Sequence, residues 1–291
     1  MGANLMGKIK LFVIFLTVVL LVSCSKANDT IAVTTREDGS GARSSFEDML
    51  QIGTNITNTI TPNAIIQNGN GIMTYFINNN SSAIGYISFA TYQRSNQRIR
   101  SVSIDGVSAT AENITSGLYP LVRPFNLIYS PEKIGVLEEA FIAFVTSSIG
   151  YAVLTEAGVV VNNDSVLEFD YLNWELSEQT VIFGGSTSTE STAMLLMKEF
   201  MNVFPQIEMI YESVGSGAGI IGVNEGIFSL GFASRVITAD EIAAGIAYVT
   251  YCLDGLVIVV NTNNEVEDLS IELLRDIYLG SVSRWSNIKN R

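Results

Sequence analysis

Histidine is absent from the 291-residue sequence, and cysteine occurs only twice. Without histidine the chain has no Ser-His-Asp triad, no Cys-His pair and no zinc site with histidine ligands. Cys24 and Cys252 are not expected to pair, because Cys252 lies in an apolar stretch that favours a small buried side chain. These absences disfavour enzymatic functions, and we expect no catalytic residues, no metal site and no cofactor.

Basic residues are also scarce. The sequence has 16 Lys and Arg against 29 Asp and Glu, which gives a formal net charge of −13. This balance disfavours nucleic acid as a partner. It leaves a small anion open as a ligand, because oriented N–H groups and one arginine in a desolvated site act more strongly than screened charges on a distant surface.

The first 23 residues have the pattern of a signal peptide. Lys8 and Lys10 precede an apolar run over residues 11–22 that is too short to span a bilayer as a stable helix. The run ends in Leu21-Val22-Ser23-Cys24, which is similar to a bacterial lipobox, although Cys24 could also be an ordinary buried cysteine. We expect cleavage after residue 23, a lipid anchor on Cys24 and a location on the outer face of the bacterial cell membrane.

After the leader, strand-like and helix-like segments alternate, which predicts an α/β fold. Residues 38–41, 184–188 and 215–219 form three strand-to-helix junctions rich in glycine and serine. Each junction places hydroxyls and unpaired N–H groups at a helix start, where negative charge is favoured. Each hydroxyl could instead cap its own helix, but three such junctions favour an anion site. None has the spacing of a nucleotide-binding loop, so a free anion fits better than a nucleotide.

The junctions belong to a set of short motifs that covers nearly all of the chain after the leader. Its main members are Arg36-Glu37-Asp38-Gly39-Ser40-Gly41, Gly185-Ser186-Thr187-Ser188, Gly215-Ser216-Gly217-Ala218-Gly219, Gly231-Phe232-Ala233-Ser234-Arg235 and Leu253-Asp254-Gly255. Together these motifs resemble the phosphate-binding protein of bacterial phosphate ABC transporters, which has a type II periplasmic-binding-protein fold.

The resemblance implies two α/β lobes with a ligand cleft between them. One lobe would combine residues 28–121 with 262–291, and the other would be residues 122–261. Two crossing strands, near residues 120–124 and 259–262, would act as the hinge about which a monomer closes on its ligand.

The order of the motifs differs from the family's usual order and resembles a circular permutation. In the family the Gly-Ser-Thr-Ser segment opens the mature chain, whereas here the segment with Arg36 comes first. A permuted chain needs neighbouring ends, so we expect Asp29 and Ile288 to lie within about 25 Å. The alternative is a domain-swapped assembly of two chains.

The resemblance also implies which residues hold the ligand: Arg36, Ser40, Gly41, Thr187, Ser188, Ser216 and Ser234. Arg36 would bind phosphate oxygens, or alternatively form a surface salt bridge with a neighbouring acid. Ala42 and Ser234 stand where family members often have a threonine and a proton-accepting aspartate. Phosphate and sulfate therefore both stay open as ligands.

The sequence as a whole predicts a lipid-anchored solute-binding protein that captures phosphate or a similar oxyanion and delivers it to an ABC permease. A surface sensor or adhesion protein that keeps the anion-binding fold without transport is the alternative. A phosphate-ester hydrolase is disfavoured by the missing histidines.

Overall fold

The computed structural model describes residues 29–53, 58–95, 99–156, 159–161 and 167–288. The predicted signal peptide and Cys24 lie outside these residues, so cleavage and the lipid anchor stay predictions. Within the described ranges, no helix combines the length and the apolar character that crossing a membrane requires.

The described strands form a ten-stranded sheet whose main path is β2-β1-β3-β9-β5-β8-β6-β7. The strands are β1 (Ala32–Arg36), β2 (Ile65–Gln67), β3 (Ala83–Ser88), β4 (Ile99–Ile104), β5 (Val122–Tyr129), β6 (Gln179–Gly185), β7 (Ile207–Ser213), β8 (Leu230–Ala233), β9 (Ala247–Asn261) and β10 (Asp268–Leu269). Parallel pairs dominate at the two outer parts of the path, whereas β5 and β9 pair antiparallel in the middle.

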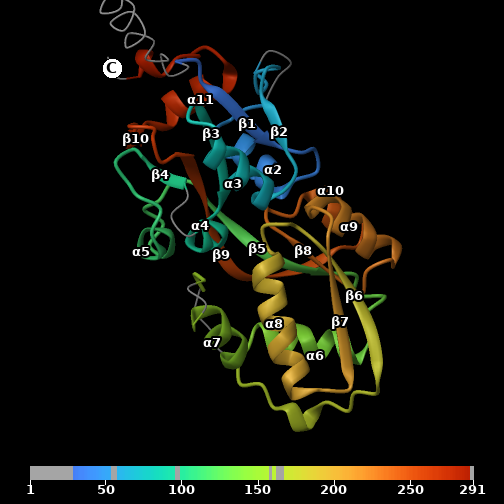
Figure 1. Cartoon of the computed structure of the whole chain (residues 1–291). Coiled ribbons are helices and arrows are strands. Elements are labelled where there is room, and N and C mark those ends of the chain that lie inside the picture. Colours follow the sequence, from blue (N-terminus) through green and yellow to red (C-terminus); the bar gives the residue numbers. More distant parts are fainter. Residues whose placement is uncertain (1–28, 54–57, 96–98, 157–158, 162–166, 289–291) are drawn as a thin grey trace, which may run out of the picture.

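Helices cover the sheet on both sides (Figure 1). They are α2 (Gly41–Met49), α3 (Asn70–Asn79), α4 (Phe89–Arg94), α5 (Ala111–Thr115), α6 (Val136–Val145), α7 (Ser148–Glu156), α8 (Glu190–Val203), α9 (Ser216–Glu225), α10 (Ala239–Ala243) and α11 (Ile271–Leu279), with two short 3-10 helices at Tyr171–Asn173 and Trp285–Asn287. Because helices lie over both faces, the parallel strands read as continuous apolar runs, and every residue of β3 is buried.

The core divides into two main clusters of buried apolar side chains. The first cluster packs around the ring stack of Phe46, Tyr86 and Tyr278, and the second around Phe141, Phe144 and Phe200. The first cluster is built mainly from residues before 122 and after 255, the second from residues between 125 and 252. The free thiol of Cys252 is buried in the second cluster, as predicted.

Strands β5 and β9 run between the upper and the lower part of the molecule (Figure 1), and each has residues that pack on both clusters. Along β5 the change falls between Val122, which packs on the first cluster, and Phe125, which belongs to the second. Along β9 it falls between Leu253 and Cys252. The segment at residues 259–262, where the sequence predicted the crossing of the second strand, lies further along β9 and inside the first cluster. That prediction was wrong because a uniform apolar run shows no sign of where its packing partners change.

The two ends of the described chain lie together. The N–H of Trp285 donates to the carbonyl of Asp29 at 2.9 Å, and the N–H of Ser286 donates to the Asp29 carboxylate at 2.9 Å. Ile288 follows two residues later, so it lies within the predicted separation of about 25 Å. Close ends are what a permuted order requires, and the permuted order itself stays a prediction.

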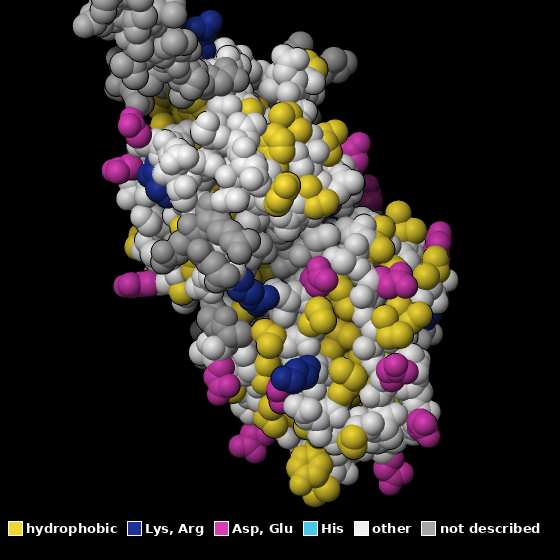
Figure 2. All heavy atoms as spheres, in the orientation of Figure 1, with side chains coloured by type: hydrophobic (Ala, Val, Ile, Leu, Met, Phe, Trp, Pro, Cys, Tyr) yellow, Lys and Arg dark blue, Asp and Glu magenta, His cyan; other side chains and the backbone are white. Residues whose placement is uncertain are grey.

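The surface agrees with the acidic composition. Figure 2 shows many acidic side chains and few basic ones around the visible face. A surface of this sign gives no support to nucleic acid binding.

Candidate functional site

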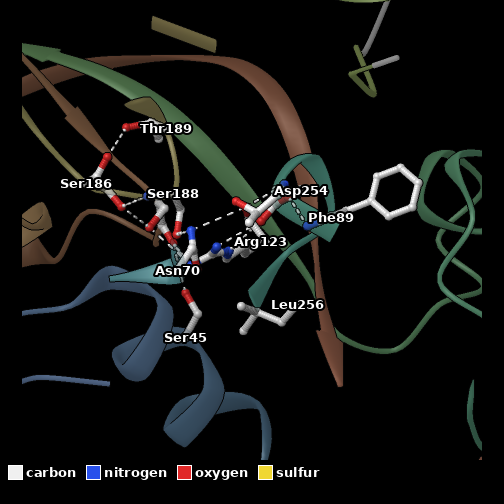
Figure 3. Close-up of polar contacts among 12 residues, drawn as sticks. Ser45, Asn70, Phe89, Arg123, Ser186, Ser188, Thr189, Asp254 and Leu256 are labelled. Atoms are coloured by element: carbon white, nitrogen blue, oxygen red, sulfur yellow. Dashed lines mark hydrogen bonds and ion pairs between the residues drawn. The ribbon is translucent and has the colours of Figure 1, made fainter. Parts of the chain in front are cut away.

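Polar side chains from the elements around both clusters meet where the starts of α2, α3, α8 and α9 converge. The first cluster contributes the ends of β1 and β3 and the starts of α2 and α3. The other side contributes the ends of β6 and β8 and the starts of α8 and α9. Figure 3 shows several of these side chains pointing toward one another from different elements. Helix starts present free N–H groups, so the convergence favours negative charge at this point.

Arg36 is the central cation of the site and is 1% exposed. Its Nη1 donates to Asn70 Oδ1 at 3.0 Å, and its Nη2 donates to Thr187 Oγ1 at 2.8 Å. Thr187 comes from the far side of the junction between the clusters, so this hydrogen bond joins the two sides. The salt-bridge alternative is confirmed in part, because Arg36 pairs with Glu37 at 2.7 Å, although Arg36 is 1% exposed and Glu37 25% exposed. The role of Arg36 as a ligand residue stays a prediction.

Glu37 balances the charge of Arg36. Burial raises the pKa of Glu37, but the hydrogen bonds and charge of Arg36 and the N–H of Gly69 together outweigh burial and hold it below its ordinary value. Glu37 is therefore ionised at neutral pH. The two side chains form a neutralised pair. Glu37, Asn70 and Thr187 use four of the five N–H bonds of the Arg36 guanidinium, which leaves one on Nη1 that could face an anion.

Asn70 extends the site to Ser188. Its Nδ2 donates to Ser188 Oγ at 3.2 Å and to Ser88 Oγ at 3.4 Å. The N–H of Ser188 donates in turn to Ser186 Oγ at 3.1 Å. Asn70, Ser186 and Ser188 are each at most 4% exposed, so these hydrogen bonds form away from solvent.

Gly41, Ser216 and Ser234 meet on the other flank of the site. A Cβ on Gly41 would lie 2.2 Å from Ser216 Oγ and 2.7 Å from Ser234 Oγ, so only glycine fits there. The N–H of Ser234 donates to Ser216 Oγ at 3.1 Å, and the N–H of Gly217 donates to the carbonyl of Gly39 at 3.1 Å. The starts of α2 and α9 are therefore in direct contact.

The predicted ligand-binding residues thus come together in one place, and their role in binding stays a prediction. Ser40 behaves as the capping alternative expected, since its side chain accepts from the N–H of Arg43 and caps α2. Ser216 and Ser188 instead use their hydroxyls in contacts between elements. Arg235, which follows Ser234, pairs with Glu241 at 2.6 Å at the side of the site.

Several residues of this region were missed by the sequence interpretation: Ser45, Asn70, Arg123, Ser186 and Asp254. Asn70 stands between Gly69 and Gly71 at a fourth helix start, which the glycine pattern could have indicated. The available signal for Arg123 and Asp254 was a charge inside an apolar strand. Such a charge needs a partner, but the sequence does not say which.

Arg123 on β5 and Asp254 on β9 form an ion pair behind Ser234. Nε and Nη2 of Arg123 donate to the Asp254 carboxylate at 3.0 and 2.8 Å, and both side chains are at most 2% exposed. Burial raises the pKa of Asp254 to about 6, although Arg123 and the N–H of Phe89 act in the opposite direction. Burial also disfavours the charged form of Arg123 and so lowers its pKa, and the negative charge of Asp254 offsets part of this effect.

Two cavities flank the polar centre. A groove of about 1110 Å³ opens beside Asn70 and Thr187 and is lined by methionines of α8 and β7. Figure 2 shows apolar side chains gathered over this part of the surface. A smaller cavity of about 340 Å³ lies on the other side, between Ser40 and Arg235. The polar centre therefore lies between two openings, one mainly apolar and one lined by charged groups.

The groups of the site are of the kinds that suit an anion. They are guanidinium, amide and hydroxyl donors at helix starts, which match the acceptor oxygens of a tetrahedral oxyanion. Within the described residues, no group of three or more acidic or thiol side chains is placed to hold a metal ion. The two carboxylates beside the site, Glu37 and Asp254, are each bound by an arginine and a backbone N–H.

A polar centre lies between two core clusters, and two strands of a mixed sheet cross from one cluster to the other. This arrangement is that of a solute-binding protein of the type II periplasmic-binding-protein class. Residues 25–148 and 174–290 match the PBP superfamily domain, and the chain belongs to this superfamily.

Named relatives narrow the class further. The chain is 32% identical over 271 residues to "Phosphate-binding protein PstS 2" of Streptococcus pneumoniae, with 92% of this chain and 90% of the relative covered. It is 28% identical over 273 residues to the protein of the same name from Streptococcus agalactiae, with 91% and 90% covered. A crystal structure of a phosphate-binding protein of a phosphate ABC transporter from Streptococcus pneumoniae superimposes with a TM-score of 0.69 at 30% identity, covering 89% of this chain and 99% of that one. The family resemblance and the fold class are confirmed, and the relatives are binding proteins rather than enzymes.

Proposed function

We propose that this protein is a lipid-anchored solute-binding protein that captures phosphate and delivers it to an ABC permease. The observation that carries the proposal is buried Arg36, which donates to Asn70 on its own side and to Thr187 on the other. The relatives named above, which bind phosphate, support the choice of anion.

In the proposed mechanism the two core clusters are the centres of two lobes. We place the chain before residue 122 and after residue 252 in the first lobe and residues 122–252 in the second, with β5 and β9 as the hinge; the predicted lobe boundary at residue 261 moves to the point on β9 where the packing partners change. Phosphate oxygens accept from Arg36 and from the helix starts at Ser40 and Gly41 on one side. Thr187, Ser188, Ser216 and Ser234 supply donors from the other side. Closing the lobes removes water from the site and strengthens each of these charge-assisted hydrogen bonds.

The proposed location follows from the leader. Lipid on Cys24 would hold a monomer at the outer face of the membrane, next to the permease. Replacing Cys24 with alanine is expected to move the protein from the membrane fraction to the soluble fraction, as read by immunoblotting after cell fractionation. A variant that stays with the membrane would show that another segment anchors it.

Titration calorimetry tests the binding function. The full-length protein, purified in a mild detergent, is titrated with inorganic phosphate, sulfate and glycerol phosphate. We expect heat with phosphate, and a loss of affinity of about tenfold or more in Arg36→Lys, because lysine cannot reach three partners with a planar fork of donors. Arg284→Lys is the matched control, since that exposed side chain lies near the chain ends. No heat with any of the three anions would refute the proposal.

Delivery to a permease is tested in cells. A strain that lacks this protein is expected to take up labelled phosphate more slowly at low external concentration. Wild type should restore uptake, and Arg36→Lys should not. Normal uptake in the deletion strain, combined with tight phosphate binding in vitro, would favour the alternative of a surface sensor.

A further inference from the structure

The buried pair of Arg123 and Asp254 occupies a special place in the fold. It lies on β5 and β9, the two strands that pass from one core cluster to the other. Both side chains are at most 2% exposed, and such a pair is costly to desolvate unless it has many partners. Its partners come from both sides of the junction. The N–H of Phe89 at the start of α4 donates to Asp254 at 2.9 Å, and Arg123 donates to the Ser234 carbonyl after β8 at 3.0 Å. Arg123 extends the contacts into the anion site (Figure 3).

The link from Arg123 to the site passes through Ser234. Nη1 of Arg123 donates to the Ser234 carbonyl at 3.0 Å and to Ser234 Oγ at 3.1 Å. Ser234 Oγ lies 2.7 Å from Ser186 Oγ, which accepts from the N–H of Ser188 at 3.1 Å. Each hydroxyl therefore accepts one hydrogen bond from a fixed donor. The hydrogen bond between the two hydroxyls uses the O–H hydrogen of one serine. The O–H hydrogen of the other serine can therefore donate to an anion.

Each of the two buried arginines is paired with a carboxylate. The first arginine of the site, Arg36, is neutralised by Glu37, and Arg123 is neutralised by Asp254. Burial makes charge interactions stronger than in water, so a change at Asp254 alters the potential at the neighbouring hydroxyls. The positive charge of Arg123 favours an anion at Ser234, and Asp254 opposes it.

We propose that Arg123 is a positioning residue of the anion site, which orients the hydroxyls of Ser234 and Ser186 and adds positive potential, and that Asp254 limits the affinity by partly cancelling that charge. This inference rests on the proposed function. It assigns to the pair a role in setting affinity that a purely structural ion pair on the crossing strands would not have.

Two variants separate the roles. Asp254→Asn keeps an oxygen for Arg123 but removes the negative charge, so at pH 7.5 it is expected to bind phosphate more tightly by about tenfold or more. The double variant Arg123→Met with Asp254→Leu replaces the pair by apolar side chains, an exchange that buried ion pairs often tolerate. It is expected to keep a melting temperature near that of wild type and to lose about tenfold or more in affinity. Arg284→Met, which replaces an exposed arginine outside the site by the same apolar side chain, is the control for the loss of an arginine and should bind like wild type.

The pH dependence of the phosphate affinity is a second measurement. A purely structural role of the ion pair would not change the ratio of the affinities of Asp254→Asn and wild type with pH. Protonation of Asp254 mimics the asparagine variant, so the ratio of the two phosphate affinities should approach one below the Asp254 pKa of about 6. The other groups facing Asp254 are Arg123, Tyr119, Tyr251 and Cys252. Burial raises the pKa of Tyr119, Tyr251 and Cys252, and Arg123 remains charged at these pH values, so none of the four titrates in this range. Titration of phosphate itself is common to both proteins and cancels in the ratio.

The outcomes are distinct. Tighter binding by Asp254→Asn together with weaker binding by a stable double variant supports the inference. Affinities of both variants within about threefold of wild type, or a loss in Asp254→Asn that follows its loss of melting temperature, would overturn it. If Asp254→Asn melts too low for calorimetry, the rise of its melting temperature with added phosphate replaces the affinity, and a rise no larger than that of wild type counts against the inference. Absence of phosphate binding by wild type overturns the proposed function and this inference together.

Discussion

Gly41 offers the sharpest test of how the site closes. It is the first residue of α2 and faces Ser216 and Ser234 across the junction of the two clusters. A Cβ there would lie 2.2 Å from Ser216 Oγ and 3.0 Å from Ser216 Cβ, both well inside contact distance. Rotating the Ser216 hydroxyl away would break the hydrogen bond that it accepts from the N–H of Ser234. Gly41→Ala is therefore expected to hold the two sides apart.

The size of the effect follows from overpacking. An extra methyl group in a closely packed buried contact costs about 1–3 kcal/mol. A cost of about 2 kcal/mol, confined to the form in which the two sides touch, weakens phosphate binding by about 30-fold. The unliganded protein is expected to keep its melting temperature, because lobes that separate relieve the contact.

Calorimetry and thermal melting of the same samples provide the assay. Gly217→Ala is the matched control, since its Cβ would meet the Gly39 carbonyl at 3.5 Å, an ordinary contact at the same junction. Its affinity should stay within about threefold of wild type. Gly41→Ala that binds phosphate as well as the control would refute the closure argument. A melting temperature that falls before ligand is added would show that the clash disrupts folding and not closure.

Three further predictions concern the site and the core. Thr187→Val removes the hydroxyl that accepts from Arg36 across the junction, so affinity should fall by about tenfold, measured by calorimetry, with little change in melting temperature. The depressed pKa of Glu37 contributes stability above its ordinary value of 4.5, and this contribution is lost as pH falls through the lower folded pKa; a Glu37→Gln variant should lack that part of the acid dependence in thermal melts from pH 6 to about 3. Phe200→Ala empties the centre of the second cluster, where the ring meets Phe141 at 5.2 Å, and should lower the free energy of unfolding by about 3–5 kcal/mol in urea titrations.

Local pattern was enough to predict the general architecture. Alternating strand and helix segments indicated an α/β fold, and the buried face of α8 follows the apolar spacing of its sequence. The glycine and serine junctions marked helix starts correctly, because capping and turn chemistry act within a few residues. The same reasoning could not locate the crossing point on β9, where apolar residues continue through a change of packing partners.

The sequence by itself determined the class of the protein and indicated most of the donors proposed for the site, since residue types set hydrogen-bonding chemistry and short motifs set local backbone shape. Tertiary structure alone decided which of these groups meet. Arg36 and Thr187 stand 151 positions apart along the chain, and Arg123 and Asp254 stand 131 apart, yet both pairs are in hydrogen-bond contact. Such contacts depend on how the sheet passes between the two clusters, and a buried charge in a strand shows only that it needs a partner.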